Sequence, residues 1–505
     1  MTLGTEEAAA REETDWLAPH PRVVAAAAVF SLGVAVPAVV ALARFLLGRD
    51  VAVGLVVAAG AGATVLIAAA GAAYETARLR TTRYRLTGQR LELRSGIWTK
   101  EHRAVPRERV RSVDVTADPV RRALGLAVVK VGTGEHASGE RAELTLDALA
   151  VAEAEALRRV LLAERPAEQA EGPLAELRWS WIRYAPLTVW TVVGGGLVLG
   201  GLYKLLGTLG FEPSESEAVA RAWEWFTATP WLTVPILLLA NVLVGLVGAI
   251  ALYAESWGKY RLEREPATLR IRRGLLTTRS LTLEERRLRG VAVTEPLLLR
   301  LGGGARVTAV ATGLKKAEEN QTEDVAALTP PLPAGEARRI ASGVLREEFD
   351  PAGLRGHPRA ARGRRVRRAL LTVVTLAAGL GVLASRTSWV PGWVWALPVL
   401  AVPAGWALAA DAYRSLGHGL TRRHLLTRSG TARRRTVALD RAGIVGWTIS
   451  QSVFQRRAGL LNVSATTAAG AGRYDVLDVG QDDGLLLASR AVPGLLEPFV
   501  EEFVE

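Results

Sequence analysis

The residue types that most often carry catalysis or bind metals are sparse in this chain and are not grouped. There is no cysteine among the 505 residues, which excludes thiol catalysis, disulfide bonds and zinc–thiolate sites. The six histidines show neither H-E-x-x-H nor any other metal-ligand spacing, so we expect no metal site. They are His20, His102, His136, His357, His418 and His424. The adjacent acids Glu284 and Glu285 lie in a basic strand-like segment and are more simply solvated charges than a catalytic pair.

Motifs for nucleotide binding and acyl transfer are also missing from the sequence. No G-x-x-x-x-G-K-[ST] phosphate loop occurs, and GTGEH at 132–136 is typical of a hairpin turn. No G-x-S-x-G elbow and no grouping of Ser, His and Asp stands out. We therefore expect a protein that is not an enzyme and that needs no cofactor.

Arginine is the residue type whose spacing does suggest a binding role. The net charge is +13, and cations recur just before the second glycine of each repeat described below. These cations are Arg121, Arg122, Arg300, Arg456 and Arg457. Because these cations recur at the same place in each repeated unit, they could contact phospholipid headgroups or an acidic partner. A solvated loop is the simpler alternative.

A second set of arginines lies between Arg355 and Arg368, just before the fifth apolar segment. Its members nearest the membrane are predicted to contact anionic phospholipid, at about 1 kcal/mol per cation near the surface. They are Arg362, Arg364, Arg365, Arg367 and Arg368. The same cations would also fix the membrane topology, and the two roles can coexist. No aromatic residues alternate with them, so we do not expect nucleic-acid binding.

The elements that position these residues begin with six apolar segments in three pairs. The chain is 49% hydrophobic and 22% charged, which suits a membrane protein with sizeable water-soluble parts. A helix that crosses about 30 Å of hydrocarbon needs roughly 20 apolar residues. The segments are 23–43, 51–73, 185–202, 231–253, 369–384 and 393–410. We predict six transmembrane helices in three hairpins, at 23–73, 183–253 and 369–410, behind an N-terminal tail at 1–22.

Flanking charge sets the predicted orientation. Lys and Arg crowd the hairpin ends that lead into polar segments, whereas the 203–230 connection is rich in Glu. We therefore expect a multi-pass protein with both termini and the large polar parts cytoplasmic. The first span lacks a signal-peptide pattern and is predicted to be an anchor. No ionisable residue falls near the middle of a span, which argues against an ion-coupled transporter.

A sequence pattern recurs three times, each time directly after a pair of spans. The segment YRLTGQRLELRSG at 84–96 alternates apolar and polar residues as a half-buried strand does, and related segments occur at 260–274 and 418–430. Each copy ends in a glycine, and a second glycine follows 29 residues later. These glycines are Gly96, Gly125, Gly274, Gly303, Gly430 and Gly459. Glycines at fixed offsets in strand patterns mark turns, so we assign them a structural role. An amphipathic helix is predicted to close each unit, at 151–162, 334–349 and 489–503.

The three units, at 78–165, 257–350 and 414–505, resemble the membrane-flanked bacterial pleckstrin-homology-like (PH-like) domain. The resemblance is carried by the opening Y-x-L-T, by R-x-L-G-L around Gly125 and by the strand that follows. Three units behind hairpins resemble the larger, YdbT-like members of that family. The implied fold is an α-helical membrane part plus cytoplasmic β-rich units, each a strongly bent seven-stranded sheet capped by a C-terminal helix. Repeat 2 departs with Gly-Gly-Gly at 302–304, and repeat 3 has His418 in place of the opening tyrosine.

The resemblance also implies a function: a bacterial cytoplasmic (inner) membrane protein that binds or scaffolds without catalysis. Relatives are associated with envelope integrity, envelope stress and resistance to membrane-active peptides, often beside a smaller one-domain homologous membrane protein. We therefore expect that smaller protein and anionic phospholipid as partners. Two rival functions stay open: an exporter or flux system for peptides or lipids through the six-helix bundle, and an interfacial lipid-modifying enzyme. The sequence leaves undecided the oligomeric state and whether the three units pack together.

Overall fold

The computed structural model describes residues 16–110, 112–132, 143–161, 172–208, 228–312, 326–386 and 392–496, with a few positions between 217 and 225. The chain forms two compact units, Met1–Glu285 and Arg286–Glu505. The boundary between them falls inside the second repeat, after its third long strand. Most of the predicted 203–230 connection and the last part of the predicted 489–503 helix lie outside the described residues.

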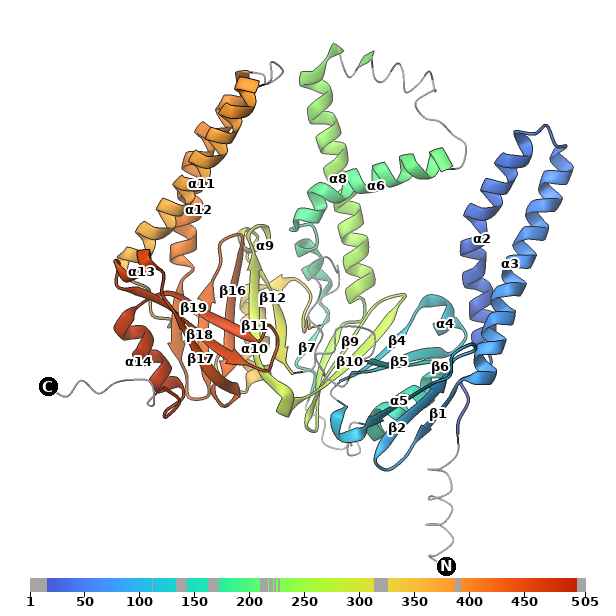
Figure 1. Cartoon of the computed structure of the whole chain (residues 1–505), viewed down its shortest axis with the longest axis horizontal. Coiled ribbons are helices and arrows are strands. Elements are labelled where there is room, and N and C mark those ends of the chain that lie inside the picture. The colour runs from blue at the N-terminus through green and yellow to red at the C-terminus, as the bar shows by residue number, and fades with distance from the viewer. Residues whose placement is uncertain are drawn as a thin grey trace, which may run out of the picture. The chain divides into compact units, whose positions relative to one another are not determined.

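The first hairpin consists of two long apolar helices, α2 (Val23–Leu47) and α3 (Val53–Thr81), which lie side by side in Figure 1. Both exceed the roughly 20 residues that a bilayer crossing needs. Small residues let the helices approach: a Cβ added at Gly71 would lie 2.0 Å from Ser31 Oγ, and one at Gly60 would lie 3.1 Å from a methyl group of Val39. The packing of this hairpin therefore depends on glycine at the contact.

The second hairpin pairs α6 (Val189–Thr208) with α8 (Pro230–Trp257). A Cβ added at Gly245 of α8 would lie 1.8 Å from the carbonyl oxygen of Thr191 in α6. At the same crossing, the side-chain amide of Asn241 donates a hydrogen bond to the carbonyl oxygen of Val192. Close backbone approach and an interhelical hydrogen bond are both typical of helix packing in membranes.

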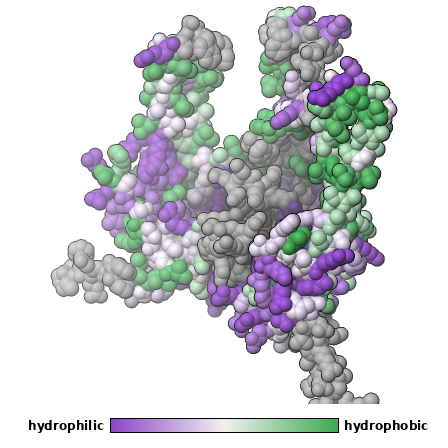
Figure 2. All heavy atoms as spheres, turned by 45° about the vertical axis from the view of Figure 1, so that its right-hand side comes forward, coloured by the Kyte–Doolittle hydropathy of each residue, from purple (hydrophilic) through white to green (hydrophobic). Residues whose placement is uncertain are grey.

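The third hairpin comprises α11 (Arg359–Arg386) and α12 (Ala396–Arg414). Among the described residues, five helices are long and apolar enough to cross a membrane: α2, α3, α8, α11 and α12. In α6 the described apolar stretch, Thr191–Gly207, is shorter than a span. The structure therefore supports five of the six predicted spans. In Figure 2 hydrophobic residues cover much of the helical hairpins, and hydrophilic residues gather on the β-rich parts.

Each hairpin is followed by a repeat of two strand groups, a short helix and a closing helix. Repeat 1 contains β1 (Arg83–Leu86), β2 (Arg90–Ser95), β3 (Glu101–Pro106), β4 (Ser112–Ala117), α4 (Pro119–Ala123), β5 (Leu126–Gly132), β6 (Glu143–Ala150) and α5 (Val151–Leu161). Repeat 2 contains β8 (Arg261–Glu265), β9 (Thr268–Arg273), β10 (Thr278–Glu284), β11 (Leu288–Pro296), α9 (Leu297–Leu301), β12 (Gly304–Ala311) and α10 (Ala334–Leu345). Repeat 3 contains β14 (Gly417–Leu420), β15 (His424–Ser429), β16 (Arg433–Asp440), β17 (Ile444–Ser450), α13 (Val453–Arg456), β18 (Leu460–Thr467), β19 (Arg473–Gly480) and α14 (Gln481–Ala491). Two short strands, β7 (Ala175–Glu176) and β13 (Leu332–Pro333), pair with β8 and β12.

The sheets do not stop at the end of a repeat. In unit 1, the order β6-β5-β4-β10-β9-β8-β7 joins the last strands of repeat 1 to the first strands of repeat 2. In unit 2, the order β13-β12-β11-β16-β15-β14 joins repeat 2 to repeat 3 in the same way. Only β1-β2-β3 and β17-β18-β19 form separate three-stranded sheets among the described strands. Each unit therefore contains one sheet that is shared by strands of two neighbouring repeats.

This topology modifies the implied seven-stranded unit. In the described residues, repeats 1 and 3 each contribute three plus three long strands and a closing helix. The seven-stranded sheet that does occur is assembled from two repeats and the short strand β7. The bent-sheet-plus-helix plan of a PH-like unit is retained, but each middle sheet is shared.

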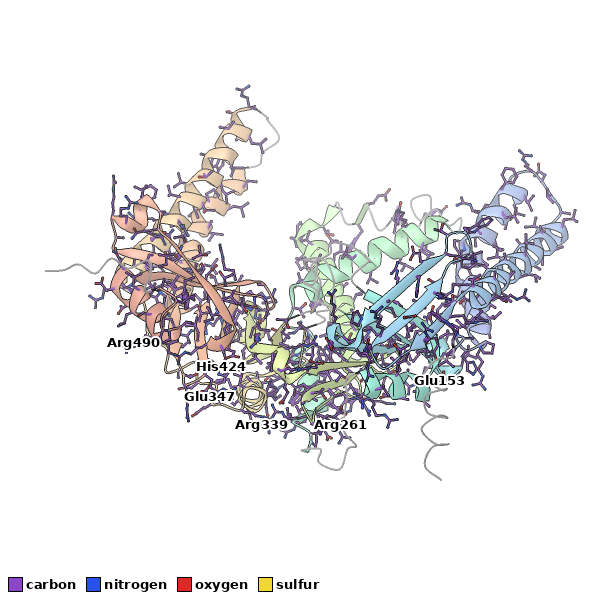
Figure 3. The ribbon with its side chains drawn as sticks, turned by 60° about the horizontal axis from the view of Figure 1, so that its bottom comes forward. Glu153, Arg261, Arg339, Glu347, His424 and Arg490 are labelled. Carbon is purple, nitrogen blue, oxygen red and sulfur yellow. The ribbon has the colours of Figure 1, made fainter. Side chains whose placement is uncertain are left out.

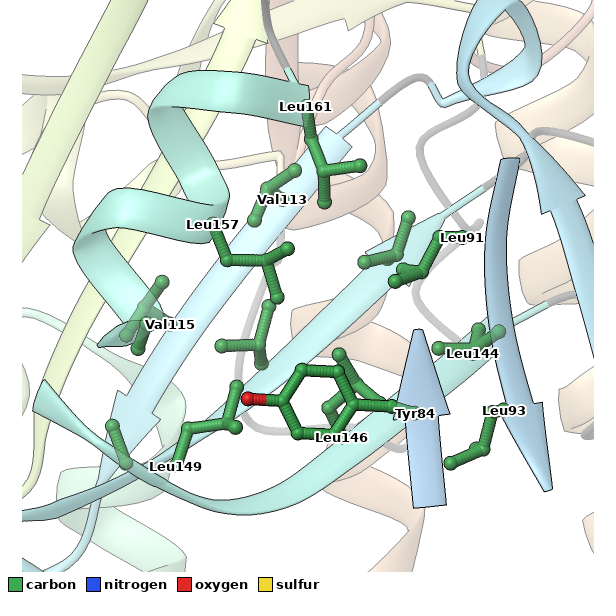
Figure 4. Packing of buried hydrophobic residues seen from close by; sticks show 14 of the residues in the cluster. Tyr84, Leu91, Leu93, Val113, Val115, Leu144, Leu146, Leu149, Leu157 and Leu161 are labelled. Atoms are coloured by element: carbon green, nitrogen blue, oxygen red, sulfur yellow. The ribbon is translucent and has the colours of Figure 1, made fainter. Parts of the chain in front are cut away.

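The core of repeat 1 forms where the alternating strands of both groups meet the closing helix α5. Figure 4 shows Leu91, Leu144 and Leu157 converging there with Tyr84. Leu91 and Leu144 are at most 2% exposed, and truncating such a leucine costs about 2–5 kcal/mol. Burial raises the pKa of Tyr84 to about 12, so its hydroxyl is neutral at physiological pH.

The first glycine of each repeat ends the second strand in a tight turn. Gly96, Gly274 and Gly430 have φ of 119°, 106° and 108°. A Cβ on any of them would lie 1.8–2.0 Å from a backbone carbonyl oxygen three residues later. Only glycine tolerates this approach, which explains the glycine at equivalent positions in the three copies.

The third closing helix differs from the prediction. It spans Gln481–Ala491, directly after β19, and does not begin at 489. The predicted 489–503 pattern was wrong because Pro493 and Gly494, the latter with φ of 84°, end the helix just where the pattern should begin. The helices α5 and α10 begin at the predicted residues.

Candidate functional site at the hairpin bases

A cavity lies at the base of the first hairpin, where α3 meets the sheets of repeat 1. It measures about 360 Å³ and is lined by Glu75, Arg78, Trp98 and Asp147, among others. Arg78 bonds to Glu75 at 2.5 Å and to Asp147 at 2.7 Å. These ion pairs tie the end of a membrane helix to strand β6.

Arg121, one of the cations predicted to contact headgroups, belongs to this network. Its guanidinium pairs with Asp118 at 2.7 Å and with Asp147 at 3.2 Å, and Asp118 also caps α4 by accepting from the Arg121 backbone N–H. Three carboxylates thus share two guanidinium groups, counting Glu75 and Arg78. The cavity itself is lined by the carboxylates Glu75 and Asp147 and by one guanidinium group, Arg78, a balance that does not favour a phosphate. These ion pairs therefore form a structural contact between α3, α4 and β6.

The recurring cation in the short helix has a different contact in each repeat. Arg122, Arg300 and Arg456 occupy equivalent positions in α4, α9 and α13. The Arg122 guanidinium donates to the Leu275 carbonyl of repeat 2 at 2.8 Å, and Arg300 pairs with Asp411 of α12 at 2.8 Å. Both contacts therefore reach the next hairpin or repeat. Arg456 and its neighbour Arg457 are exposed and form no ion pair within the described part of the chain.

At the base of the third hairpin, Asp478 is a buried anion, 1% exposed, in strand β19. It accepts hydrogen bonds from Arg364, from Arg365 at 3.3 Å and from the Gln455 amide at 3.0 Å. Its backbone lies at φ of 56°, a left-handed conformation that is uncommon outside glycine. Removing one partner from a buried ion pair is strongly destabilising. The contact of Arg364 with Asp478 therefore holds α11 against the strands of repeat 3.

The predicted lipid-contacting arginines therefore fall into two groups. Arg364 and Arg365 face Asp478 and are largely buried. The other three are exposed and have no ion-pair partner among the described residues; they are Arg362, Arg367 and Arg368. The helix α11 begins at Arg359, so the arginine cluster is helical. One face of the helix contacts Asp478, and the other face is exposed.

Two histidines complete the network at the third hairpin base. His418 Nδ1 and His357 Nε2 are 3.0 Å apart, and His357 Nδ1 lies 3.1 Å from the Asp478 carbonyl. Burial lowers the pKa of both, with that of His418 falling to about 4, and the partner histidine adds to the effect at His418. The sequence offered one hint, since His418 replaces a tyrosine of the other repeats.

A second histidine contact joins the segment before the third hairpin to repeat 3. His424 Nδ1 bonds to a carboxylate oxygen of Glu347, and Figure 3 shows the two residues close together. Burial opposes ionisation of Glu347, but the hydrogen bonds from His424 and Thr421 outweigh it and lower its pKa. No group of three or more His, Cys, Asp or Glu side chains among the described residues is arranged to hold a metal.

Sequence reasoning missed the charged network of unit 1. Arg158 of α5 is 2% exposed and pairs with Glu265 of β8 at 3.2 Å, while Arg270 of β9 pairs with Glu155 of α5 at 2.6 Å. Burial opposes ionisation of Glu265, but Arg158 and Arg270 lower its pKa overall. These pairs link repeat 1 to the first sheet of repeat 2, and no local pattern in either segment reveals them.

Comparison with protein families agrees with the three-fold repeat. A sequence model of the bacterial PH domain matches residues 28–165, 217–346 and 369–486, so each match includes hairpin residues and the β-rich part that follows. Comparison with curated proteins gave no match, and comparison with solved structures gave none. The three matches cover well over half of the chain. With its repeated sheets, closing helices and membrane-length hairpins, this chain belongs to the bacterial PH domain family.

Proposed function

We propose that this chain is a non-enzymatic binding or scaffold protein of the bacterial cytoplasmic (inner) membrane, with its β-rich heads and both termini in the cytoplasm. The observation that carries the proposal is the shared sheet at both repeat junctions. Within each compact unit, one shared sheet joins strands of two neighbouring repeats, and ion pairs hold the hairpin bases to the strands, which suits a scaffold. The charged groups at the hairpin bases are used in these contacts between helices and strands.

The hairpin bases offer a binding surface for lipid. Exposed arginines at the start of α11 suit anionic phospholipid in the adjacent leaflet. We propose that the protein partner is a smaller one-domain homologous membrane protein, and that the complex serves envelope integrity or resistance to membrane-active peptides. Because the hairpins tether the heads, binding needs no separate recruitment to the bilayer.

Affinity purification from native membranes tests the partner. The tagged chain is crosslinked, solubilised and purified, with an untagged chain as control, and proteins that co-purify are identified and quantified. A single small membrane protein at a fixed ratio supports the proposal. Purification of the chain alone, or with lipid only, refutes the partner and redirects attention to vesicle transport assays for the exporter function.

Cysteine accessibility tests the orientation separately. The chain contains no cysteine, so a single Gln89→Cys change in the exposed turn between β1 and β2 provides a unique label. We expect a membrane-impermeant maleimide to label it only after the cells are permeabilised. Labelling in intact cells would place the heads outside and contradict the cytoplasmic assignment.

A further inference from the structure

Both internal junctions join the same two kinds of strand. At the first, the third strand of repeat 2 (β10) pairs antiparallel with the fourth strand of repeat 1 (β4). At the second, β16 of repeat 3 pairs antiparallel with β11 of repeat 2. The third strand of repeat 1 (β3) and the fourth strand of repeat 3 (β17) are the edges of their sheets among the described strands. Each end of the chain thus carries one half of a junction.

The two internal junctions also have the same register. Leu283 pairs with Ser112 at the first junction, and the equivalent Leu439 pairs with Gly290 at the second. Carried to the free ends by the repeat offsets, this register places Val105 of β3 opposite Gly446 of β17. It likewise places Glu101 opposite Ser450, as Arg279 lies opposite Thr116 and Arg435 opposite Thr294. The register of the two internal junctions therefore determines which residues of β3 and β17 would lie opposite each other.

The edge strand β17 exposes a residue whose counterparts are buried. Ile449 is 40% exposed, whereas the equivalent Val115 and Val293, which lie in paired strands, are 8% and 4% exposed. The short helix that follows repeats this contrast. In α9 the Leu297 N–H donates to the Ala432 carbonyl of the next repeat at 2.7 Å, but the equivalent helix α13 leaves Val453 63% exposed.

The matching surface at the other end of the chain is equally bare. The residue equivalent to Ala432 in repeat 1 is Trp98, which is 95% exposed in the turn before β3. Phe454 of α13 is 66% exposed, and Arg456 beside it lacks the cross-repeat contact that Arg122 and Arg300 make. An apolar turn at one end and an apolar short helix at the other are complementary in the way that the internal junctions are.

The opposite edges of the first sheets are protected. Leu17 bridges to Tyr84 at β1, β7 pairs with β8, and Arg355 bridges to His418 at β14. In all three repeats, the segment before the hairpin covers the outer edge of the first strand. Natural proteins cover or blunt edge strands to prevent pairing with other chains. Within the described part of the chain, no strand covers the edges of β3 and β17, in contrast to this consistent protection.

We propose that β3 of one copy pairs with β17 of a second copy, which continues the sheets head to tail from chain to chain. The pairing is antiparallel, with Glu101 opposite Ser450 and Val105 opposite Gly446, and Trp98 of one copy packs on α13 of the next. A second copy is the occupant because the chain carries both halves of a junction that it already forms twice. The contact is heterologous, so copies build a ring or an open row in the plane of the membrane. This inference deepens the proposed scaffold function and rests on it only in placing the heads on one side of the bilayer.

Disulfide trapping between single-cysteine chains tests the pairing in native membranes. Two differently tagged full-length chains, one with Glu101→Cys and one with Ser450→Cys, are co-expressed and mildly oxidised. Both residues are exposed, and directly opposed strand residues lie within disulfide reach. We expect a disulfide-linked heterodimer carrying both tags. The internal control is Arg279→Cys with Thr116→Cys in one chain, which samples the same register at an existing junction.

A register control makes the result specific. Replacing Ser450→Cys by Ile449→Cys turns the thiol to the other face of the sheet, so the heterodimer should fall about tenfold. Absence of the heterodimer while the internal control forms its disulfide would overturn the proposal. Disulfide capture of a smaller membrane protein by either cysteine, or closure only within a chain carrying both cysteines, would overturn it as well. These outcomes are independent of whether a smaller partner co-purifies with the unmodified chain.

Discussion

Gly290 in β11 is the residue on which the junction between repeats 2 and 3 depends most sharply. It lies opposite Leu439 of β16 with φ of 152°, and a Cβ added there would lie 2.0 Å from the Ala438 carbonyl oxygen. Gly290→Ala therefore forces both an unfavourable backbone conformation and a separation of the strands. Each effect costs about 1–3 kcal/mol, so we expect a loss of about 2–6 kcal/mol.

The assay is the thermal stability of the full chain in detergent, followed as the fraction that stays soluble after heating. A loss of this size lowers the Tm by roughly 4–24 °C, at about 2–4 °C per kcal/mol for a unit of this length. The matched control is Gly446→Ala in the detergent-solubilised monomer, at the equivalent position of the edge strand β17, where an added Cβ meets nothing within 4 Å. Equal effects of the two changes, or no effect of Gly290→Ala, would refute the close strand approach at this junction.

Three further predictions follow from the hairpin bases. Asp478→Ala leaves Arg364 buried without its partner and should cost about 3–5 kcal/mol in the same heating assay, whereas Asp475→Ala, which breaks a largely exposed pair, should cost less than about 1 kcal/mol. Burial lowers the pKa of His418 from 6.5 to about 4, so the unfolded chain binds the proton at a higher pH than the folded chain does. The free energy of unfolding should therefore fall by up to about 3 kcal/mol as the pH drops from 6.5 to 4. His418→Asn should flatten the dependence of the Tm on pH. Neutralising the exposed cations of α11 should reduce the anionic phospholipid that co-purifies, by about fivefold per cation, as measured by mass spectrometry of extracted lipid. The changes are Arg362→Gln, Arg367→Gln and Arg368→Gln.

The sequence predicted the repeated parts of the fold because each leaves a local pattern. Apolar runs of span length fix the hairpins, and glycines at constant offsets mark turns whose backbone no other residue can adopt. The third predicted span, 185–202, included residues before the start of α6 at Val189. The described apolar stretch of this helix, Thr191–Gly207, is shorter than a span. Patterns of this kind report on neighbours in sequence.

The sharing of sheets could not be predicted, since an alternating strand reads the same whether its partner is in its own repeat or in the next. The same limit applies to charge. Arg364 and Arg365 resemble the other cations of their cluster, and only the fold brings them to Asp478, more than a hundred residues away. Arg158 and Arg270 were missed for the same reason, because their partners belong to other elements.

The central claim is that neighbouring repeats form single sheets, and its most direct test is disulfide formation at both junctions in native membranes. One chain carries Arg279→Cys with Thr116→Cys, and another carries Arg435→Cys with Thr294→Cys; both pairs are directly opposed in the shared sheets. We expect each pair to close within its own chain, seen as a faster-migrating monomer that reverts on reduction. Failure of either pair to close, or closure only between chains, would contradict the shared sheet at that junction.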